Sequence, residues 1–293
     1  MKNLLIVLLV IPTLTFAQRD WDAIEIKTNE LTDNISWLEG SGGNIGVIHG
    51  NEGIMIIDDQ FAELSEKISQ ALSSLSDGEL KFIVNTHFHG DHTGGNENLS
   101  ANGALIVAHQ NVRERLGTTF FSDIRNSDVA SKPASFWPTI TFSEEATFYF
   151  NDEEIQIIHL PAAHTDGDAM IFFKTSNILH TGDAFVRYGY PFIDTPAGGS
   201  IDGIIAAQEA ILKVADSETK IIPGHGQLSS IQDVAELLQM LKTTRRIVAQ
   251  LKQDGKSLDE AMTARPLASY HERWSGSFID SDMFVRLIYE SID

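Results

Sequence analysis

Short apolar runs alternate with helically spaced apolar positions along the chain from Asn44 onward. Two runs, NIGVIHG and GIMIIDD, flank a turn at Gly50 to Gly53 and predict a pair of strands. The next stretch, FAELSEKISQALSSL, has apolar residues at helical spacing, and buried strands are predicted for LKFIVNTH and ALIVAH. This order indicates an α/β fold in which a largely buried sheet is covered by helices.

The second half of the chain has the same organisation, although no fixed-period repeat is present. Strands are predicted for TFYF, EIQIIHLP, AMIFFK and NILHTGD, and a helix is predicted for SIDGIIAAQEAILKVA. A last strand follows in TKIIPGHG, and the remainder is mostly amphipathic helix, most clearly in VAELLQMLKTTRRIVAQLKQ. Each half therefore carries strands followed by helices, and several of its strands end in His or Asp.

Residues 111–146 depart from both patterns. They place Phe120, Phe121, Phe136, Trp137 and two prolines among polar residues. Two interpretations stay open for this segment, a flap over a cleft and an ordinary packed connection.

The N-terminus has the pattern of a secretory signal peptide. One Lys precedes an apolar run of roughly a dozen residues, and Thr15, Phe16 and Ala17 form a small cleavage region. The run is shorter than the roughly 18 apolar residues of a membrane-spanning helix, and no comparable run follows. We expect residues 1–17 to be removed and residues 18–293 to form one periplasmic or secreted domain without a membrane span. The alternative is an uncleaved anchoring helix.

Composition restricts the chemistry that the chain can perform. The 293 residues include no Cys, which excludes disulfides and thiolate ligands, so any metal must be held by nitrogen and oxygen. The formal net charge of −20 would repel a phosphate backbone, so no nucleic-acid partner is expected. That charge does not exclude a local basic pocket.

Three of the ten histidines are crowded into the six residues HFHGDH. His87 and His89 are two residues apart and point to the same side of an extended chain. Asp91 and His92 follow in a glycine-containing turn that can bring them back toward the same point. Imidazoles beside a carboxylate suit zinc, so these four residues are predicted metal ligands.

Three later apolar strands also end in a possible ligand. They lead into His164, Asp183 and His225. Side chains at strand ends along one sheet edge can meet in a common cleft. Together with the first four, they make too many ligands for one tetrahedral ion, so two metal ions are predicted.

This set of residues, with Asp58 after the strand IMII, resembles the metallo-β-lactamase superfamily over nearly the whole chain after residue 17. The resemblance implies a four-layer αββα sandwich with two zinc ions at one edge. It assigns His87, His89 and His164 to the first ion and Asp91, His92 and His225 to the second. It implies that Asp183 bridges both ions, as in glyoxalase II and lactonase-type members. Asp58 is expected to orient a ligand His from behind.

The resemblance also narrows the reaction. Members that use a Cys ligand are excluded because the chain has none, and His89 stands where flavodiiron members carry Glu. Two ions would activate a shared water for attack on a carbonyl group. Asp91 is expected to orient this nucleophile or carry its proton. Tyr188 and Tyr190 are expected either to contact the developing oxyanion or simply to pack.

The sequence therefore predicts an exported dinuclear zinc hydrolase that acts on a small molecule, with a β-lactam or lactone as the favoured substrate class. Two alternatives stay open: an iron-dependent oxidoreductase on the same fold, and a metal-binding protein that does not catalyse a reaction. Neither the actual substrate nor the oligomeric state follows from the sequence, because specificity resides in the loops around the site.

Overall fold

The computed structural model describes residues 19–122, 127–276 and 278–292. The expected signal peptide, residues 1–17, lies outside these residues and stays a prediction. Among the helices in the described ranges, none has both the length and the apolar character needed to cross a bilayer.

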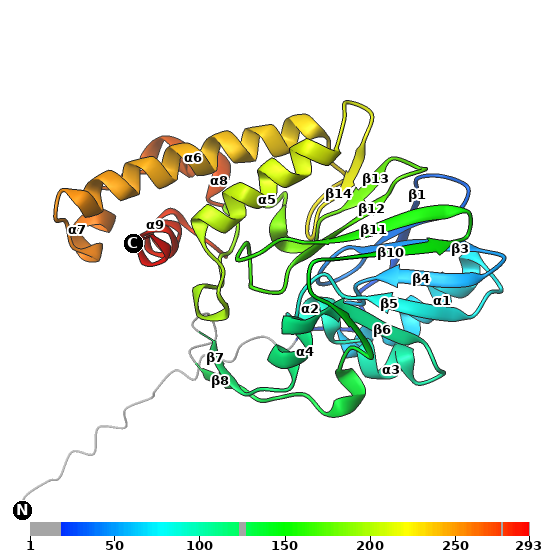
Figure 1. Cartoon of the computed structure of the whole chain (residues 1–293). Coiled ribbons are helices and arrows are strands. Elements are labelled where there is room, and N and C mark those ends of the chain that lie inside the picture. Colours follow the sequence, from blue (N-terminus) through cyan, green and yellow to red (C-terminus); the bar gives the residue numbers. More distant parts are fainter. Residues whose placement is uncertain (1–18, 123–126, 277, 293) are drawn as a thin grey trace, which may run out of the picture.

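Two mixed sheets are stacked face to face at the centre of the molecule (Figure 1). The first has seven strands in the order β1-β2-β3-β4-β5-β6-β9. Their bounds are Lys27–Glu30, Ile35–Glu39, Ile45–Gly50, Gly53–Ile57, Leu80–Val84, Leu105–His109 and Ile140–Phe142. The predicted strand pair is confirmed as β3 and β4, in which Gly50 lies opposite Gly53 across the turn.

The second sheet has five strands in the order β10-β11-β12-β13-β14. Their bounds are Glu145–Phe150, Glu153–His159, Ala169–Phe173, Ile178–His180 and Lys220–Ile222. The first four strands pair antiparallel, whereas β13 and β14 run parallel and are connected through a helix. A separate small hairpin joins β7 (Phe120–Ser122) to β8 (Ser127–Val129).

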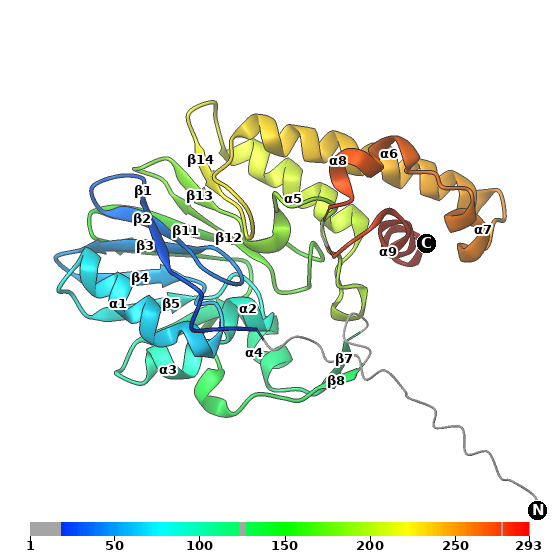
Figure 2. The same ribbon diagram turned by 180° about the vertical axis from the view of Figure 1, so that it is seen from behind.

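Helices cover the outer face of each sheet. Their bounds are α1 Ser65–Leu75, α2 Gly90–Thr93, α3 Asn96–Ser100, α4 Gln110–Leu116, α5 Ile201–Val214, α6 Ile231–Gln253, α7 Leu258–Thr263, α8 His271–Trp274 and α9 Ser281–Ser291. Seen from behind, α1 lies across the seven-stranded sheet, whereas α5 and α6 lie over the five-stranded one (Figure 2). This arrangement is the expected four-layer αββα sandwich.

Burial on both faces explains why the strands read as nearly continuous apolar runs. In β4, Met55 and Ile57 point into the layer between the sheets, where they meet residues such as Ile155 of β11. Ile54 and Ile56 point the other way, into the layer beneath α1. Since neither face of this strand meets water, a single polar substitution in it would bury an unsatisfied group.

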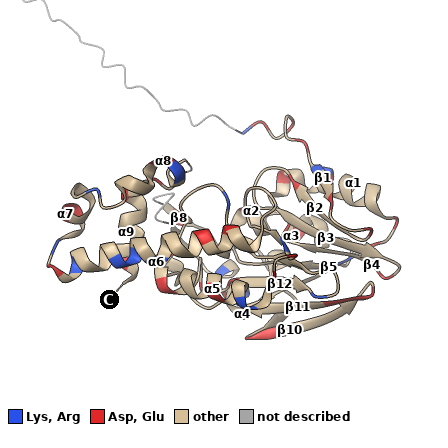
Figure 3. Ribbon diagram, turned by 90° about the horizontal axis from the view of Figure 1, so that it is seen from above, with Lys and Arg blue, Asp and Glu red and all other residues tan. Residues whose placement is uncertain are grey.

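The charged side chains of α6 are separated by sign along the helix (Figure 3). Its acidic residues, Asp233 and Glu236, lie in the first half, and its basic residues, Lys242, Arg245, Arg246 and Lys252, lie in the second half. The apolar side of α6 packs with α5 and α9 in one large core cluster. The helix therefore carries both signs of charge and does not form one continuous acidic face.

One close contact at the start of α5 holds the loop that follows β11. The backbone N–H of Ser200 donates to the carbonyl of Ala162 (2.9 Å), and the Ser200 side chain caps Gly203. A Cβ atom added at Gly203 would lie 1.7 Å from that carbonyl oxygen. Only glycine therefore permits this approach.

Replacing Gly203 with Ala is expected to lower the free energy of unfolding by about 1–3 kcal/mol, because the loop must move to relieve the clash. Urea denaturation measures this change. Gly276→Ala is the control, since its Cβ would meet nothing within 4 Å and should alter stability by less than about 0.5 kcal/mol. Equal stability of the two variants would contradict the argument.

Candidate metal centre

The first group of candidate ligands lies in the loop after β5. The strand ends at Val84, the chain then bends at residues 86–88 rather than continuing in extended form, and His89 has a ψ of 147°. The short helix α2 begins at Gly90 and turns Asp91 and His92 back toward the preceding histidines. The local turn inferred from the glycine-containing motif is therefore one turn of helix.

The second group comes from loops of the other sheet. His164 follows β11, Asp183 lies in a 3-10 turn after β13, and His225 follows β14. The sequence interpretation placed all of these side chains along one sheet edge, and the structure corrects that detail. They come from corresponding ends of two stacked sheets, so the site lies across the mouth of the sandwich.

Seven side chains converge at this place, and they form three overlapping groups with potential ligand atoms within 4.8 Å of one another. The groups are His87, His89 and His164; His87, His92 and Asp183; and Asp91, His92 and His225. The first and third groups have the composition expected for two separate ions. Asp183 lies between them, because one carboxylate oxygen is 3.2 Å from His92 Nε2 and the other is 3.7 Å from His164 Nε2.

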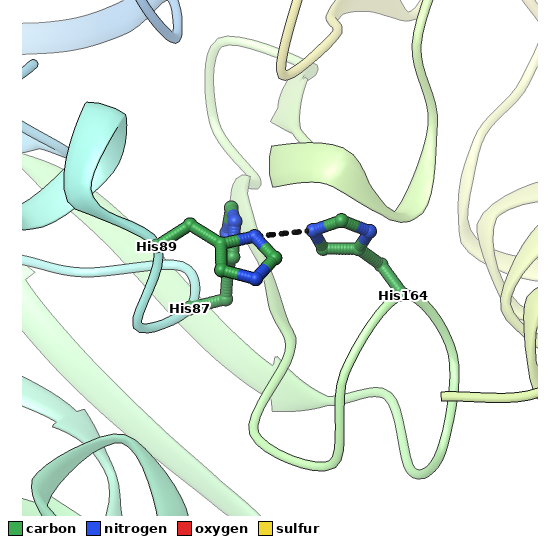
Figure 4. Close-up of side chains that lie close together, drawn as sticks. All are labelled: His87, His89 and His164. Carbon is green, nitrogen blue, oxygen red and sulfur yellow. Dashed lines mark hydrogen bonds between the residues drawn. The ribbon is translucent and has the colours of Figure 1, made fainter. Parts of the chain in front are cut away.

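Three imidazoles of the first group face one another. Figure 4 shows His89 and His164 approaching edge to edge, with His87 behind them. The closest pair of nitrogens, His89 Nδ1 and His164 Nε2, is 2.8 Å apart. His87 crosses His164 at nearly a right angle, with ring centroids 4.7 Å apart. Such an arrangement brings ring nitrogens, rather than ring faces, toward a common point.

Acceptors behind the histidines determine which nitrogen each one turns inward. His164 Nδ1 must donate to the carbonyl of Phe192 (2.9 Å), because a carbonyl oxygen only accepts. His92 Nδ1 lies 2.7 Å from the Asp58 carboxylate, and His89 Nε2 lies 2.9 Å from the Asp194 carboxylate. Each of these contacts places a hydrogen on the outer nitrogen and turns the inner nitrogen toward the centre of the cluster.

His87 is oriented through an intermediate hydroxyl. Thr86 Oγ1 donates its single hydrogen to Asp58 (2.7 Å), so at His87 Nδ1, 3.0 Å away, the same oxygen acts as the acceptor. His87 Nε2 is then left with a lone pair, and it is buried without a hydrogen-bond partner among the described residues. An orphaned acceptor of this kind is costly unless something binds it.

These features fit a metal centre. His87, His89 and His164 present lone pairs inward, and His92 can do so once it has lost its second proton. Asp183 Oδ1 is buried without a hydrogen bond, although His92 Nε2 is 3.2 Å from it. A nitrogen and oxygen donor set suits zinc and other first-row divalent cations. The cluster therefore has the donors and the orientations that one or more such cations require.

The electrostatic properties of the donors divide them into two classes. Burial lowers the pKa of His164 to about 4 and, with the nearby His92, lowers the pKa of His87 well below its usual value. Although burial opposes it, the Asp183 carboxylate raises the pKa of His225 to about 9, and Asp183 and Asp58 raise that of His92. Neutral imidazoles thus face one side of the cluster, and imidazoles that hold a proton face the other.

A cavity of about 480 Å³ opens over the cluster, and its floor includes His89, Asp91, His164, Asp183 and His225. Tyr188 lines it, with its ring centroid 5.6 Å from that of His225. Burial raises the pKa of the Tyr188 hydroxyl well above its usual value, so the group stays protonated and can donate a hydrogen bond.

The structure does not bring Tyr190 to this site. Its side chain is fully buried and stacks on Phe284 of α9, with ring centroids 4.5 Å apart. Gly189 between the two tyrosines has a φ of 142°, so the chain turns and sends the second ring into the helical core. The proposed contact between Tyr190 and an oxyanion is therefore wrong, and the packing alternative is correct for this residue.

Residues 111–146 supply one wall of the cavity through Leu116, Phe120, Val129 and Lys132. The sequence interpretation left a flap and a packed connection open. The segment packs partly, since Leu116 is buried, and it also covers the cleft. Movement of this wall stays a prediction.

Two carboxylates that support the site were missed. Asp194 holds His89, and Asp168 accepts hydrogen bonds from the backbone and side chain of Thr165, next to His164. Asp168 had a local signal, because it stands four residues after a predicted ligand in HTDGD. Asp194 had none, because it lies more than one hundred positions from the histidine that it holds.

Comparison with known proteins adds a family and several relatives. A model described as the metallo-beta-lactamase superfamily matches residues 38–225. A hydroxyacylglutathione hydrolase of Pelagibacter ubique is 27% identical over 150 residues, which is 50% of this chain and 52% of that protein. The chain therefore spans about half the length of this relative.

Solved structures share the fold at lower identity. A metallo-beta-lactamase from Pontibacter korlensis superimposes with a TM-score of 0.62 at 16% identity, covering 74% of this chain and 99% of its own. A double mutant of the sec-alkyl sulfatase PisA1 gives 0.70 at 14% identity, covering 90% of this chain and 50% of its own. At these identities the comparisons show the fold alone.

Asp194→Ala is expected to weaken metal binding by about 10–100-fold, because His89 loses the acceptor that fixes its orientation. Competition with a fluorescent zinc chelator measures the affinity. Asp216→Ala, in an exposed turn away from the cluster, serves as the control and should leave affinity unchanged. An Asp194 variant that binds zinc as tightly as the control would refute this role.

Zinc binding at pH 7 is expected to release protons, because His225, with a pKa of about 9, is protonated there and must lose its proton to become a ligand. Raising the pH toward 9 removes this competition, so apparent affinity should increase with pH over that range. Calorimetry in buffers that differ in heat of ionisation reports the number of protons released. A binding heat that is independent of the buffer would contradict the prediction.

Proposed function

The chain belongs to the metallo-beta-lactamase superfamily, and from this membership we propose that it is an exported zinc-dependent hydrolase with two metal ions. Its favoured substrate is a small molecule with a β-lactam or lactone ring, or a related ester, thioester or amide. One observation carries the proposal: seven nitrogen and oxygen donors from two sheets converge in three overlapping groups, and five of the seven line a single cavity.

The donor set supports two ions. His87, His89 and His164 would hold one, and Asp91, His92 and His225 the other, with Asp183 reaching both. When bound, zinc lowers the pKa of water from 15.7 toward about 7 and polarises a carbonyl group. A single-ion site would leave several of these buried donors without a partner.

Asp91 is suited to handle the proton of the attacking water. It lines the cavity, and its carboxylate oxygen lies 3.3 Å from His225 Nε2. Burial opposes ionisation, but the neighbouring His92 and His225 hold the pKa of Asp91 well below its usual value. An ionised carboxylate at the cavity floor can accept a hydrogen bond from water, which orients its lone pair toward a substrate.

Tyr188 is placed to stabilise charge that develops on the substrate. Its hydroxyl remains protonated because burial raises its pKa, and its ring lies beside His225. A donor fixed at the cavity wall lowers the energy of an oxyanion more than that of the neutral carbonyl group. Of the two tyrosines considered for contact with the oxyanion, only Tyr188 lines the cavity, since Tyr190 packs in the core.

Export is proposed from the sequence alone. A short apolar run ends before Ala17, and the described chain begins its packed structure within a few residues of that position. The absence of Cys is compatible with a periplasmic or secreted protein whose stability depends on its core. Export also disfavours an intracellular glutathione thioester as substrate.

A sulfate ester is the second candidate substrate. The sec-alkyl sulfatase structure covers 90% of this chain, against 74% for the β-lactamase structure, so it shares the fold over more of the chain. The two remaining hypotheses, iron-dependent redox chemistry and metal binding without catalysis, are separated from hydrolysis by metal analysis and by turnover.

The test is a hydrolysis panel of lactones, β-lactams, simple esters and alkyl sulfates with the zinc-loaded chain from residue 18. We expect turnover of at least one lactone or β-lactam. Asp183→Ala should reduce it by more than the roughly 100-fold that loss of a supporting residue costs, because a shared ligand is removed. Asp202→Ala removes an exposed carboxylate of α5 and serves as the control.

No turnover of any compound, or an Asp183 variant as active as the control, would contradict the proposal. Iron in the purified protein together with oxygen consumption would replace it with the redox alternative.

A further inference from the structure

Six aromatic side chains line the cavity over the metal centre, together with three basic residues, Arg19, Arg115 and Lys132. The aromatic residues are Tyr188 and five phenylalanines: Phe61, Phe88, Phe120, Phe192 and Phe278. Phe192 lies directly beside the candidate ligands, with its ring 5.5 Å from that of His164. A volume of about 480 Å³ falls within the range of small-molecule sites, which are lined by apolar groups around a few polar ones.

Phe278 is the unusual member of this wall. It is 59% exposed, although leaving a phenylalanine in water forgoes the stabilisation that burial provides. Its ring lies 5.9 Å from that of Tyr188 and 6.0 Å from that of Phe192. The three rings therefore form a continuous apolar surface that runs from the metal centre to the cavity mouth.

The residues that follow Phe278 are anchored in the helical core. The next residue, Ile279, is fully buried in the helical core, and Asp280 caps α9 by accepting from the Met283 backbone N–H (2.8 Å). Helix α9 is anchored by buried residues that include Phe284 and Ile288. Because the Ile279 side chain points into the core, the Phe278 side chain next to it points outward.

Phe278 also lies outside the part of the chain that the family shares. The family match ends at residue 225, whereas Phe278 belongs to the loop between α8 and α9. The helical region thus adds one ring to a cavity that is otherwise formed by residues closer to the sandwich. The ring therefore comes from outside the stretch that the family model matches.

We infer that the substrate carries an apolar acyl or alkyl group, which lies along Tyr188, Phe192 and Phe278, and that Phe278 determines the preference for longer groups. The inference rests on the proposed hydrolytic function and specifies its substrate class. The apolar group covers the exposed ring, while the bond to be cleaved lies at the donor cluster on the cavity floor.

The experiment compares wild-type protein with Phe278→Ala and Phe278→Leu on p-nitrophenyl esters from acetyl to octanoyl and on γ-lactones with side chains of matching length. In the wild type, kcat/KM should increase by about threefold per added methylene over the first members of the series. Phe278→Ala should lose about tenfold on the octanoyl ester and stay within about twofold on the acetyl ester. Phe278→Leu should restore most of the loss.

Phe121→Ala is the matched control. Phe121 is a comparably exposed ring, at 49%, but it does not line the cavity. Its removal should leave the dependence on chain length unchanged. A wild-type profile that is flat with chain length would overturn the inferred substrate class, and equal slopes for wild type and Phe278→Ala would overturn the role of Phe278.

Calorimetric titration of the zinc-loaded proteins with butanoate and octanoate tests the same surface without turnover. Octanoate should bind wild type and Phe121→Ala more tightly than butanoate, and Phe278→Ala should lose most of that difference. If no compound of the hydrolysis panel is turned over, the proposed function fails, but this measurement still decides the inference. Equal binding of the two acids to wild type would overturn it.

Discussion

The structure around the candidate metal centre depends on hydrogen bonds made on the far side of its histidines. A buried imidazole can bind a cation only if the nitrogen that faces the cation carries a lone pair. The outer nitrogen of each histidine donates a hydrogen bond. The acceptor is the Phe192 carbonyl for His164, the Asp58 carboxylate for His92 and the Asp194 carboxylate for His89. This constraint requires two separate loops, one after β4 and one that contains both Phe192 and Asp194, to be positioned to within hydrogen-bonding distance, and the sandwich provides that precision.

The two-sheet architecture explains how such loops come together. Asp58 follows β4 and Thr86 follows β5, so two neighbouring parallel strands deliver a carboxylate and the hydroxyl that it orders. His164, Asp183 and His225 arrive from the second sheet. Apolar packing between the sheets fixes the distance between these groups, because a buried interface adjusts little to a local change. The core therefore contributes to the site by fixing the positions of the loops that carry its residues.

Local features of the site could be predicted from the sequence, and features that depend on long-range contacts could not. His87 to His92 stand together in the chain, so their convergence follows from one turn of backbone. The strand and helix patterns predicted a buried sheet covered by helices, and the structure confirms elements such as β3 and β4. The four-layer sandwich was implied by the resemblance rather than by these patterns. Asp194 has no such local signal, since its relation to His89 exists only after the second sheet has packed on the first.

The error at Tyr190 has a related cause. The sequence does not distinguish Tyr188 from Tyr190, because both follow Asp183. In the structure, the positive φ of Gly189 turns the chain, so that Tyr188 lines the cavity and Tyr190 lies in the core. Likewise, nothing in the pattern of residues 271–292 indicates that Phe278 reaches the cavity, because its position depends on the packing of α9. Side-chain direction in irregular segments is decided by tertiary contacts.

The central claim is that inward-facing lone pairs and Asp183 together hold two cations. Anomalous diffraction at the zinc absorption edge, from crystals of the zinc-loaded protein, tests it most directly. The account predicts two peaks, one among His87, His89 and His164 and one among Asp91, His92 and His225, with Asp183 in contact with both. A single peak, or peaks away from these residues, would contradict it.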